Sequence, residues 1–106
     1  MTRAIDLSKY IVVKCDNDEY PISNLQLQKI LYYIQKEFLQ KGYGNAFADD
    51  IEAWQFGPVV PNVYYYFCGF GAMPITLFNQ TYNSDCLTYT PEALTLINKI
   101  VEKNVS

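Results

Sequence analysis

The sequence predicts a mainly α-helical fold with a small β component, an α+β domain built around a central helix at about residues 23–41. Two observations predict this class. Apolar residues recur with the helical period through most of the chain, and the helical segments begin with serine, threonine or proline residues that suit helix N-termini. At 106 residues, half of them hydrophobic, the chain has the length of one compact domain, and we expect residues 1–106 to form it.

The first helix is predicted over residues 4–15, with Thr2 as its N-cap. Its apolar side follows helical spacing at Ala4, Leu7, Ile11 and Cys15. The polar stretch that ends in Pro21 stops this helix, because proline disfavours helical geometry in the residue before it.

The central helix is expected to begin with a capping box of Ser23 and Gln26 and to stop at Gly42. Its inner face is an apolar stripe made of Leu27, Ile30, Leu31, Ile34 and Phe38. A second stripe recurs every seven residues on nearly the opposite side, at Leu25, Tyr32 and Leu39. Because a helix in the middle of a small domain is covered on both sides, we favour packing within the domain for this stripe over coverage by a partner.

The middle of the chain is predicted as a short strand at 51–56, followed by a turn at Gly57-Pro58. A third helix then starts at Pro61 and runs to about Cys68. Its inner stripe consists of Val60, Val63, Tyr64 and Phe67. Successive helical residues point 100° apart, so the neighbouring Tyr65 and Tyr66 lie off this stripe.

The C-terminal part is predicted to hold two further short strands and a last helix. The strands fall near 75–78 and 86–89 and could pair as a hairpin with a long loop. The helix begins with Thr90 as its cap and Pro91 at its first position. Its apolar side is formed by Ala93, Leu94, Ile97, Ile100 and Val101.

The composition argues against an enzyme. The chain has no histidine, which removes the commonest general base and the usual metal ligand. Asp49, Asp50 and Glu52 could be imagined as an acid-base or metal cluster, but we favour a solvated acidic loop, because no further ligands follow at a suitable spacing. The glycines fit neither a phosphate loop nor a dinucleotide fingerprint. We expect no catalytic residue, no metal and no cofactor.

Charge and cysteine content point to a cytoplasmic protein that binds other proteins. The net charge of −3 gives no positive field for nucleic acid or for an anionic membrane, and an acidic protein more readily meets a basic one. No apolar segment is long enough to span a membrane, and the N-terminus has no signal-peptide pattern. The three cysteines, Cys15, Cys68 and Cys86, predict unreactive thiols and no disulfide framework.

Two sequence blocks in a fixed order indicate a family. The first is Leu25-Gln-Leu-Gln-Lys-Ile-Leu-Tyr-Tyr33, and the second, about twenty residues later, is Glu52-Ala-Trp-Gln-Phe-Gly-Pro-Val59, with the acidic lead-in Phe47-Ala-Asp-Asp50. In these blocks the chain resembles the Panacea-domain, or SocA-like, family of bacterial and phage-associated antitoxins. The resemblance implies a protein that binds a cognate toxin encoded beside it, and either covers the toxin's active surface or delivers it to a cellular protease as an adaptor.

We expect the toxin contact to combine aromatic anchors with an acidic rim. These residues are Tyr65 and Tyr66 as anchors, Trp54 and Phe56 beside them, and Asp49, Asp50 and Glu52 as the rim. Of the family motif, only Trp54 and the turn Gly57-Pro58-Val59 map directly onto this chain, and we expect the turn to serve geometry. For Trp54 we favour a core position against the central helix over a role as an interface anchor. For Tyr65 and Tyr66 the sequence favours neither exposure nor partial burial.

Two other functions stay open. One is a phage-associated interaction protein that acts on another host target. The other is a small DNA-binding regulator, for which the third helix offers no arginine or lysine. The resemblance also leads us to expect a further C-terminal segment with a Thr-His and a Pro-Trp element, which this sequence, ending at Ser106, does not contain.

Overall fold

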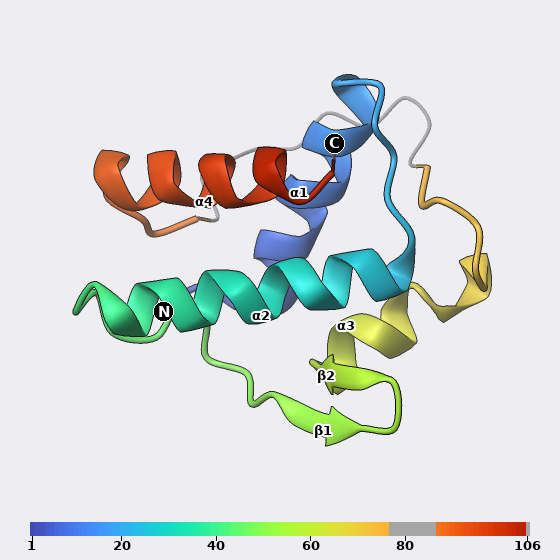
Figure 1. Cartoon of the computed structure of the whole chain (residues 1–106), viewed down its shortest axis with the longest axis horizontal. Coiled ribbons are helices and arrows are strands. Elements are labelled where there is room, and N and C mark those ends of the chain that lie inside the picture. The colour runs from blue at the N-terminus through green and yellow to red at the C-terminus, as the bar shows by residue number, and fades with distance from the viewer. Residues whose placement is uncertain (77–86, 106) are drawn as a thin grey trace.

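The structure is a computed structural model that describes residues 1–76 and 87–105. Within these residues it contains four α-helices, a short 3-10 helix and a two-stranded antiparallel sheet (Figure 1). The predicted α+β class is therefore confirmed. Helix α2 lies across the middle of the molecule, with α1 and α4 on one side and α3 and the hairpin on the other (Figure 1).

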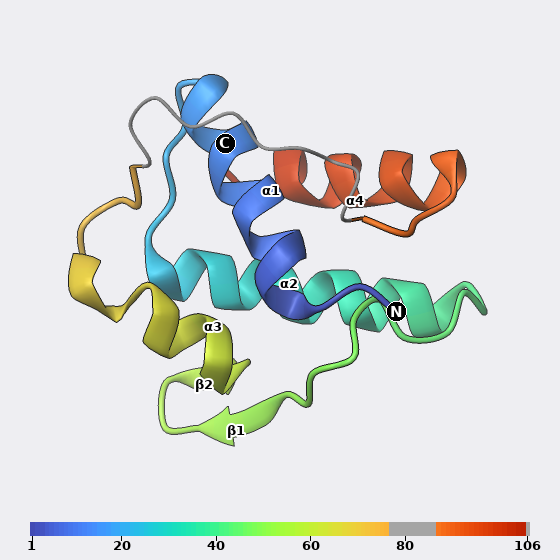
Figure 2. The same cartoon turned by 180° about the vertical axis from the view of Figure 1, so that it is seen from behind.

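Helix α2 (Asn24–Gln40) begins and packs as its sequence predicts. The Ser23 side chain accepts a hydrogen bond from the Gln26 N–H, and the Gln26 side chain accepts one from the Ser23 N–H, which completes the capping box. All five residues of the predicted inner stripe are buried in one continuous core. Helix α1 (Ala4–Asn17) crosses α2 on the side seen in Figure 2 and contributes Leu7 and Ile11 to that core.

The predicted cap of α1 is wrong. Arg3 occupies the N-cap position and makes no side-chain cap bond. The free Ala4 N–H instead donates to Asp49 Oδ1 at 2.9 Å, so a residue from the loop before the hairpin caps this helix. Thr2 is instead buried, and its hydroxyl oxygen accepts a hydrogen bond from the Thr88 N–H at 3.1 Å, which ties the N-terminal segment to the one before α4.

The strand predicted at 51–56 is shorter, at residues 52–54, and forms half of a hairpin. Strand β1 (Glu52–Trp54) pairs antiparallel with β2 (Gly57–Val59), and Trp54 stands opposite Gly57. The chain therefore turns at residues 55–56, and the predicted turn at Gly57-Pro58 is wrong. The usual two-residue hairpin loops need a positive φ at one or both turn residues, but Gln55 and Phe56 have negative φ. The positive φ is found instead at the next residue, Gly57, with a value of 123°.

The remaining helices follow the sequence closely. Helix α3 (Pro61–Tyr66) starts at the predicted proline, ends before the predicted Cys68, and continues into the 3-10 helix η1 (Cys68–Phe70). Helix α4 (Pro91–Lys103) begins as predicted, with the Thr90 hydroxyl accepting a hydrogen bond from the Ala93 N–H at 3.1 Å. No helix among residues 1–76 and 87–105 is both long and apolar enough to cross a membrane.

The two C-terminal strands predicted near 75–78 and 86–89 are not present where the structure can test them. Residues 75–76 and 87–89 have no strand assignment, and the rest of both segments, with Cys86, lies outside the described residues. Ile75 is buried, and its N–H donates to the Ile22 carbonyl oxygen at 2.8 Å. This contact attaches the end of the described segment to the loop before α2.

Candidate functional site

Four aromatic side chains from the hairpin and α3 meet in one group, which we call the aromatic cluster. It consists of Trp54, Phe56, Tyr64 and Tyr65. The Trp54 ring centroid lies 5.2 Å from that of Tyr64 and 5.9 Å from those of Phe56 and Tyr65, in tilted and edge-to-face arrangements that aromatic rings prefer. Phe56 is 48% exposed and Tyr65 is 62% exposed, so the cluster presents aromatic surface to solvent.

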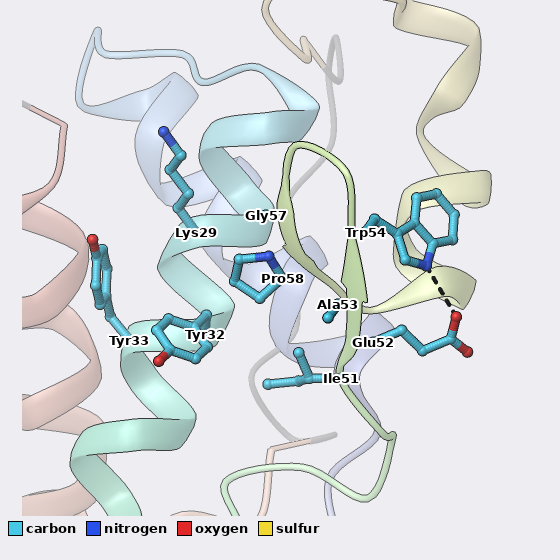
Figure 3. A pocket seen from close by; sticks show the side chains of 9 residues that line it. All are labelled: Lys29, Tyr32, Tyr33, Ile51, Glu52, Ala53, Trp54, Gly57 and Pro58. Carbon is cyan, nitrogen blue, oxygen red and sulfur yellow. Dashed lines mark hydrogen bonds between the residues drawn. The ribbon is translucent and has the colours of Figure 1, made fainter.

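Trp54 does not pack where the sequence predicted. Its indole lies on the hairpin face turned away from α2, and its ring contacts Tyr64 of α3 (Figure 3). The indole Nε1–H donates to Glu52 Oε1 at 2.9 Å, which orients the ring without burying it in the core. The favoured core position against the central helix is therefore wrong, because the β1 pleat puts this side chain on the α3 side.

Tyr66 is exposed like Tyr65 but lies apart from the aromatic cluster. Its ring packs edge-to-face on the buried Phe67 at 4.9 Å, and the Lys9 Nζ stands 5.1 Å from its centroid. Of the two alternatives left open for Tyr65 and Tyr66, exposure and partial burial, the structure shows exposure for both. It also separates them, since only Tyr65 joins Trp54 and Phe56.

The three predicted rim carboxylates lie side by side around a hollow of about 220 Å³ at the start of α3. Asp49 is partly engaged, since one oxygen caps α1 and the other accepts a hydrogen bond from Asn62 Nδ2 at 3.4 Å. Asp50 and Glu52 are exposed. Among residues 1–76 and 87–105, no group of three or more histidine, cysteine or acidic side chains could hold a metal ion.

A chain of buried polar contacts positions the cluster, and the sequence analysis missed it. Gln28 Oε1 accepts a hydrogen bond from the Val60 N–H at 2.9 Å, and its Nε2 donates to Asn24 Oδ1 at 3.0 Å. Asn24 Nδ2 in turn donates to the Tyr64 carbonyl oxygen at 2.9 Å. The sequence signal that could have indicated this network is a pair of amide side chains, Asn24 and Gln28, four residues apart beside the apolar stripe of α2. They fasten the end of the hairpin and the first turn of α3 to α2.

A groove separates the other face of the hairpin from α2. It has a volume of about 510 Å³, and Figure 3 shows Ile51 and Pro58 on its hairpin side and Tyr32 and Lys29 on its helix side. Tyr32 of the second stripe of α2 borders this groove, and all three residues of the stripe are exposed. The prediction that this stripe packs within the domain is wrong, because α1 and α4 cover other sides of α2, and the hairpin contacts α2 through β2 without covering the stripe.

A small helical domain that presents exposed aromatic side chains on a hairpin has features typical of protein-interaction domains. The model of the family described as Antitoxin SocA-like, Panacea domain, matches residues 27–105, and the chain belongs to that family. The resemblance found from the two sequence blocks is thus confirmed.

One curated relative is Antitoxin SocA from Caulobacter vibrioides (strain NA1000 / CB15N). It is 44% identical over 73 residues, which cover 66% of this chain and 36% of the relative. The chain therefore spans little more than a third of that relative's length. No solved structure matches the chain.

Proposed function

We propose that this protein is a non-catalytic antitoxin that acts in the cytoplasm and neutralises a cognate toxin by binding it directly through the aromatic cluster. The carrying observation is that the tryptophan of the family motif stands on an exposed hairpin, in contact with Tyr64 and Tyr65. Membership of an antitoxin family supports the role, and the exposed aromatic surface supports direct binding.

The cluster suits a protein contact energetically. Tryptophan and tyrosine dominate binding hot spots, because they bury much apolar area while few side-chain rotations are lost. The rings of Phe56 and Tyr65 each pack against that of Trp54, and the buried Gln28 contact holds the hairpin in place. Binding therefore immobilises little that was mobile before, which favours affinity.

The acidic side chains beside the cluster favour a basic partner. Asp50 and Glu52 are exposed next to the aromatic surface, and the whole chain carries a net charge of −3. Charges at the rim of an interface act mainly on orientation and association rate. We therefore assign Asp50 and Glu52 to steering, and give Asp49 a smaller part because it caps α1.

The bound toxin is then either occluded or passed to a cellular protease, with this protein as the adaptor. Both routes need the same direct contact. They differ in the fate of the toxin, since occlusion leaves its level unchanged while delivery lowers it. Following the toxin by immunoblot during co-expression separates the two.

The test is growth of cells that express the neighbouring gene, with and without this protein. We expect rescue by the wild type and loss of rescue by Phe56→Ala or Tyr65→Ala. Tyr20→Ala is the matched control, because Tyr20 is an equally exposed aromatic residue outside the cluster. A toxic neighbour that stays toxic beside well-folded wild-type protein contradicts the proposal for that pair.

A further inference from the structure

Helix α2 carries on its outer face a regular stripe that the described elements leave exposed. Leu25, Tyr32 and Leu39 are 45%, 37% and 55% exposed. Lys29 and Lys36, also exposed, follow Leu25 and Tyr32 by four residues each and therefore lie on the same face. The stripe thus alternates apolar and basic residues, each recurring with a period of seven.

The hairpin supplies the opposite wall of a groove along the part of this stripe from Lys29 to Leu39. Ile51, Ala53 and Pro58 line it on the hairpin side (Figure 3). A second hollow, of about 400 Å³, shares Tyr32 and Ile51 with the first and extends along α2 to Leu39. The two hollows are therefore neighbours along α2, and from here on we call them together the groove.

The two walls carry charges of opposite sign. Lys29 and Lys36 stand on the helix side, while Asp50 stands on the hairpin side. The Glu52 carboxylate lies on the other hairpin face, where it accepts the hydrogen bond from Trp54 Nε1–H (Figure 3). The ion pairs found among residues 1–76 and 87–105 join other residues, so Lys29, Lys36 and Asp50 are not engaged with one another across the groove. An occupant that complements the groove is apolar along its centre, acidic toward α2 and basic toward the hairpin.

We propose that the groove binds an amphipathic helix of the toxin, with apolar residues every seven positions, acidic residues facing Lys29 and Lys36, and a basic residue facing Asp50. This inference rests on the proposed function. It adds a second contact surface, on the hairpin face opposite the aromatic cluster. The hairpin then lies between two parts of the toxin.

The spacing of the stripe selects a helical occupant. Residues seven apart on a helix lie roughly 10.5 Å apart, at a rise of 1.5 Å per residue. A partner helix with a seven-residue pattern repeats at the same distance, as in coiled-coil packing, whereas an extended strand repeats its side chains on one face roughly every 6.8 Å. The α2 residues that line the groove run from Lys29 to Leu39, roughly 15 Å, or about three turns of a partner helix.

A second copy of this chain fits the groove poorly. A two-fold pairing of α2 helices about Tyr32 brings Lys29 of one copy toward Lys36 of the other. Such like charges across an interface disfavour the pairing. We therefore assign the groove to the toxin.

The first test places a photo-crosslinking amino acid at position 32 or at position 65 of the full chain, co-expressed with the product of the neighbouring gene. We expect both positions to crosslink that product, and position 32 to map to one helical segment of the predicted pattern. Crosslinking from position 65 alone overturns the groove assignment and leaves the proposed function intact. Crosslinking from neither position overturns both, and a crosslink from position 32 to another copy makes the groove a self-association surface.

The second test reverses the charge of the helix wall. Lys29→Glu/Lys36→Glu should weaken binding to the neighbouring product at least tenfold, while Lys99→Glu/Lys103→Glu, on exposed positions of α4, should leave it within twofold. Circular dichroism confirms that both variants are folded. Changing the mapped acidic residues of the partner to lysine should restore binding to the first variant. Unchanged binding by the first variant overturns the inference.

Discussion

Gln28 shows how a single buried side chain can hold a surface site. It is almost fully buried in α2, yet its amide meets two partners, the Val60 N–H and the Asn24 side chain. Burying a polar group costs little free energy when its hydrogen bonds are made. The Val60 N–H without its Gln28 partner would carry the full free-energy penalty of desolvation. The position of the hairpin therefore depends on a residue that no partner touches.

We predict that Gln28→Leu destabilises the protein by about 1 to 3 kcal/mol, since leucine fills similar space and leaves the Val60 N–H unpaired. Urea unfolding measures the change. Gln40→Leu, at an exposed position of the same helix, serves as the control and should change stability by less than about 0.5 kcal/mol. Equal stability of the two variants would show that the Gln28 contact carries no net energy.

Two cysteines should differ in reactivity by location. Burial raises the pKa of the Cys15 thiol to about 11, whereas Cys68 is exposed. At pH 8 we expect iodoacetamide to modify Cys68 in the folded protein and Cys15 only after unfolding, as read by peptide mass spectrometry. Modification of both at equal rates in the folded state would contradict the burial of Cys15.

The same pKa has a consequence for stability against pH. The unfolded thiol ionises near pH 9 and the folded one near 11. The free energy of unfolding therefore includes the full contribution of the neutral Cys15 thiol below pH 9. This contribution is lost as the pH rises from 9 to 11, because only the unfolded state gains the thiolate charge in that window. We expect a Cys15→Ala variant to lose less stability than the wild type between pH 8 and pH 10. Urea unfolding midpoints of the two proteins at these two pH values measure the difference.

At the scale of elements, the helices were predictable and the hairpin was only half predictable. Capping signals such as Ser23 with Gln26, or Thr90 with Pro91, act within one turn and can be read locally. Strand β2 has three residues, too few for an alternating pattern, and its Gly57-Pro58 start is typical of a turn. Strands of this length exist through pairing with a neighbour, which sequence alone does not display.

Gly57 is the residue on which the hairpin geometry depends. Its φ of 123° is strained for any residue with a side chain, although a Cβ there would meet no atom within 4 Å. We predict that Gly57→Ala destabilises the protein by about 1 kcal/mol or more through the backbone alone. Gly69→Ala is the matched control, because Gly69 has open space and no positive φ. Similar melting temperatures for the two variants would contradict this assignment.

At the scale of the molecule, one core joins the four α-helices of the part of the chain that the structure describes. It includes Ile11 of α1, Ile34 of α2, Val63 of α3 and Ile97 of α4. The sequence predicted these residues because their periodicity reports burial directly. It could not predict that the second stripe of α2 stays exposed, or that Trp54 faces α3, because both depend on where the hairpin stands. The binding roles of Trp54, Phe56 and Tyr65 stay predictions.

A single core predicts a single unfolding transition, as expected for one domain. Trp54 is the only tryptophan, so its fluorescence reports the hairpin, while far-ultraviolet circular dichroism reports the helices. We expect the two signals to give the same midpoint in urea. A fluorescence midpoint clearly below that of circular dichroism would show that the hairpin detaches before the helices melt, and that the domain is not one cooperative unit.

The cap that Asp49 supplies to α1 bears on the order in which the chain folds. Helix α2 contains its own start signal and can form early, whereas α1 gains its cap only after the chain between residues 4 and 49 has closed into a loop. An interaction made after the transition state affects the unfolding rate and hardly the folding rate. We therefore predict that Asp49→Ala accelerates unfolding about fivefold, for a cap of about 1 kcal/mol, and leaves refolding nearly unchanged in stopped-flow experiments. A slowed refolding phase would instead place the docking of α1 in the folding nucleus.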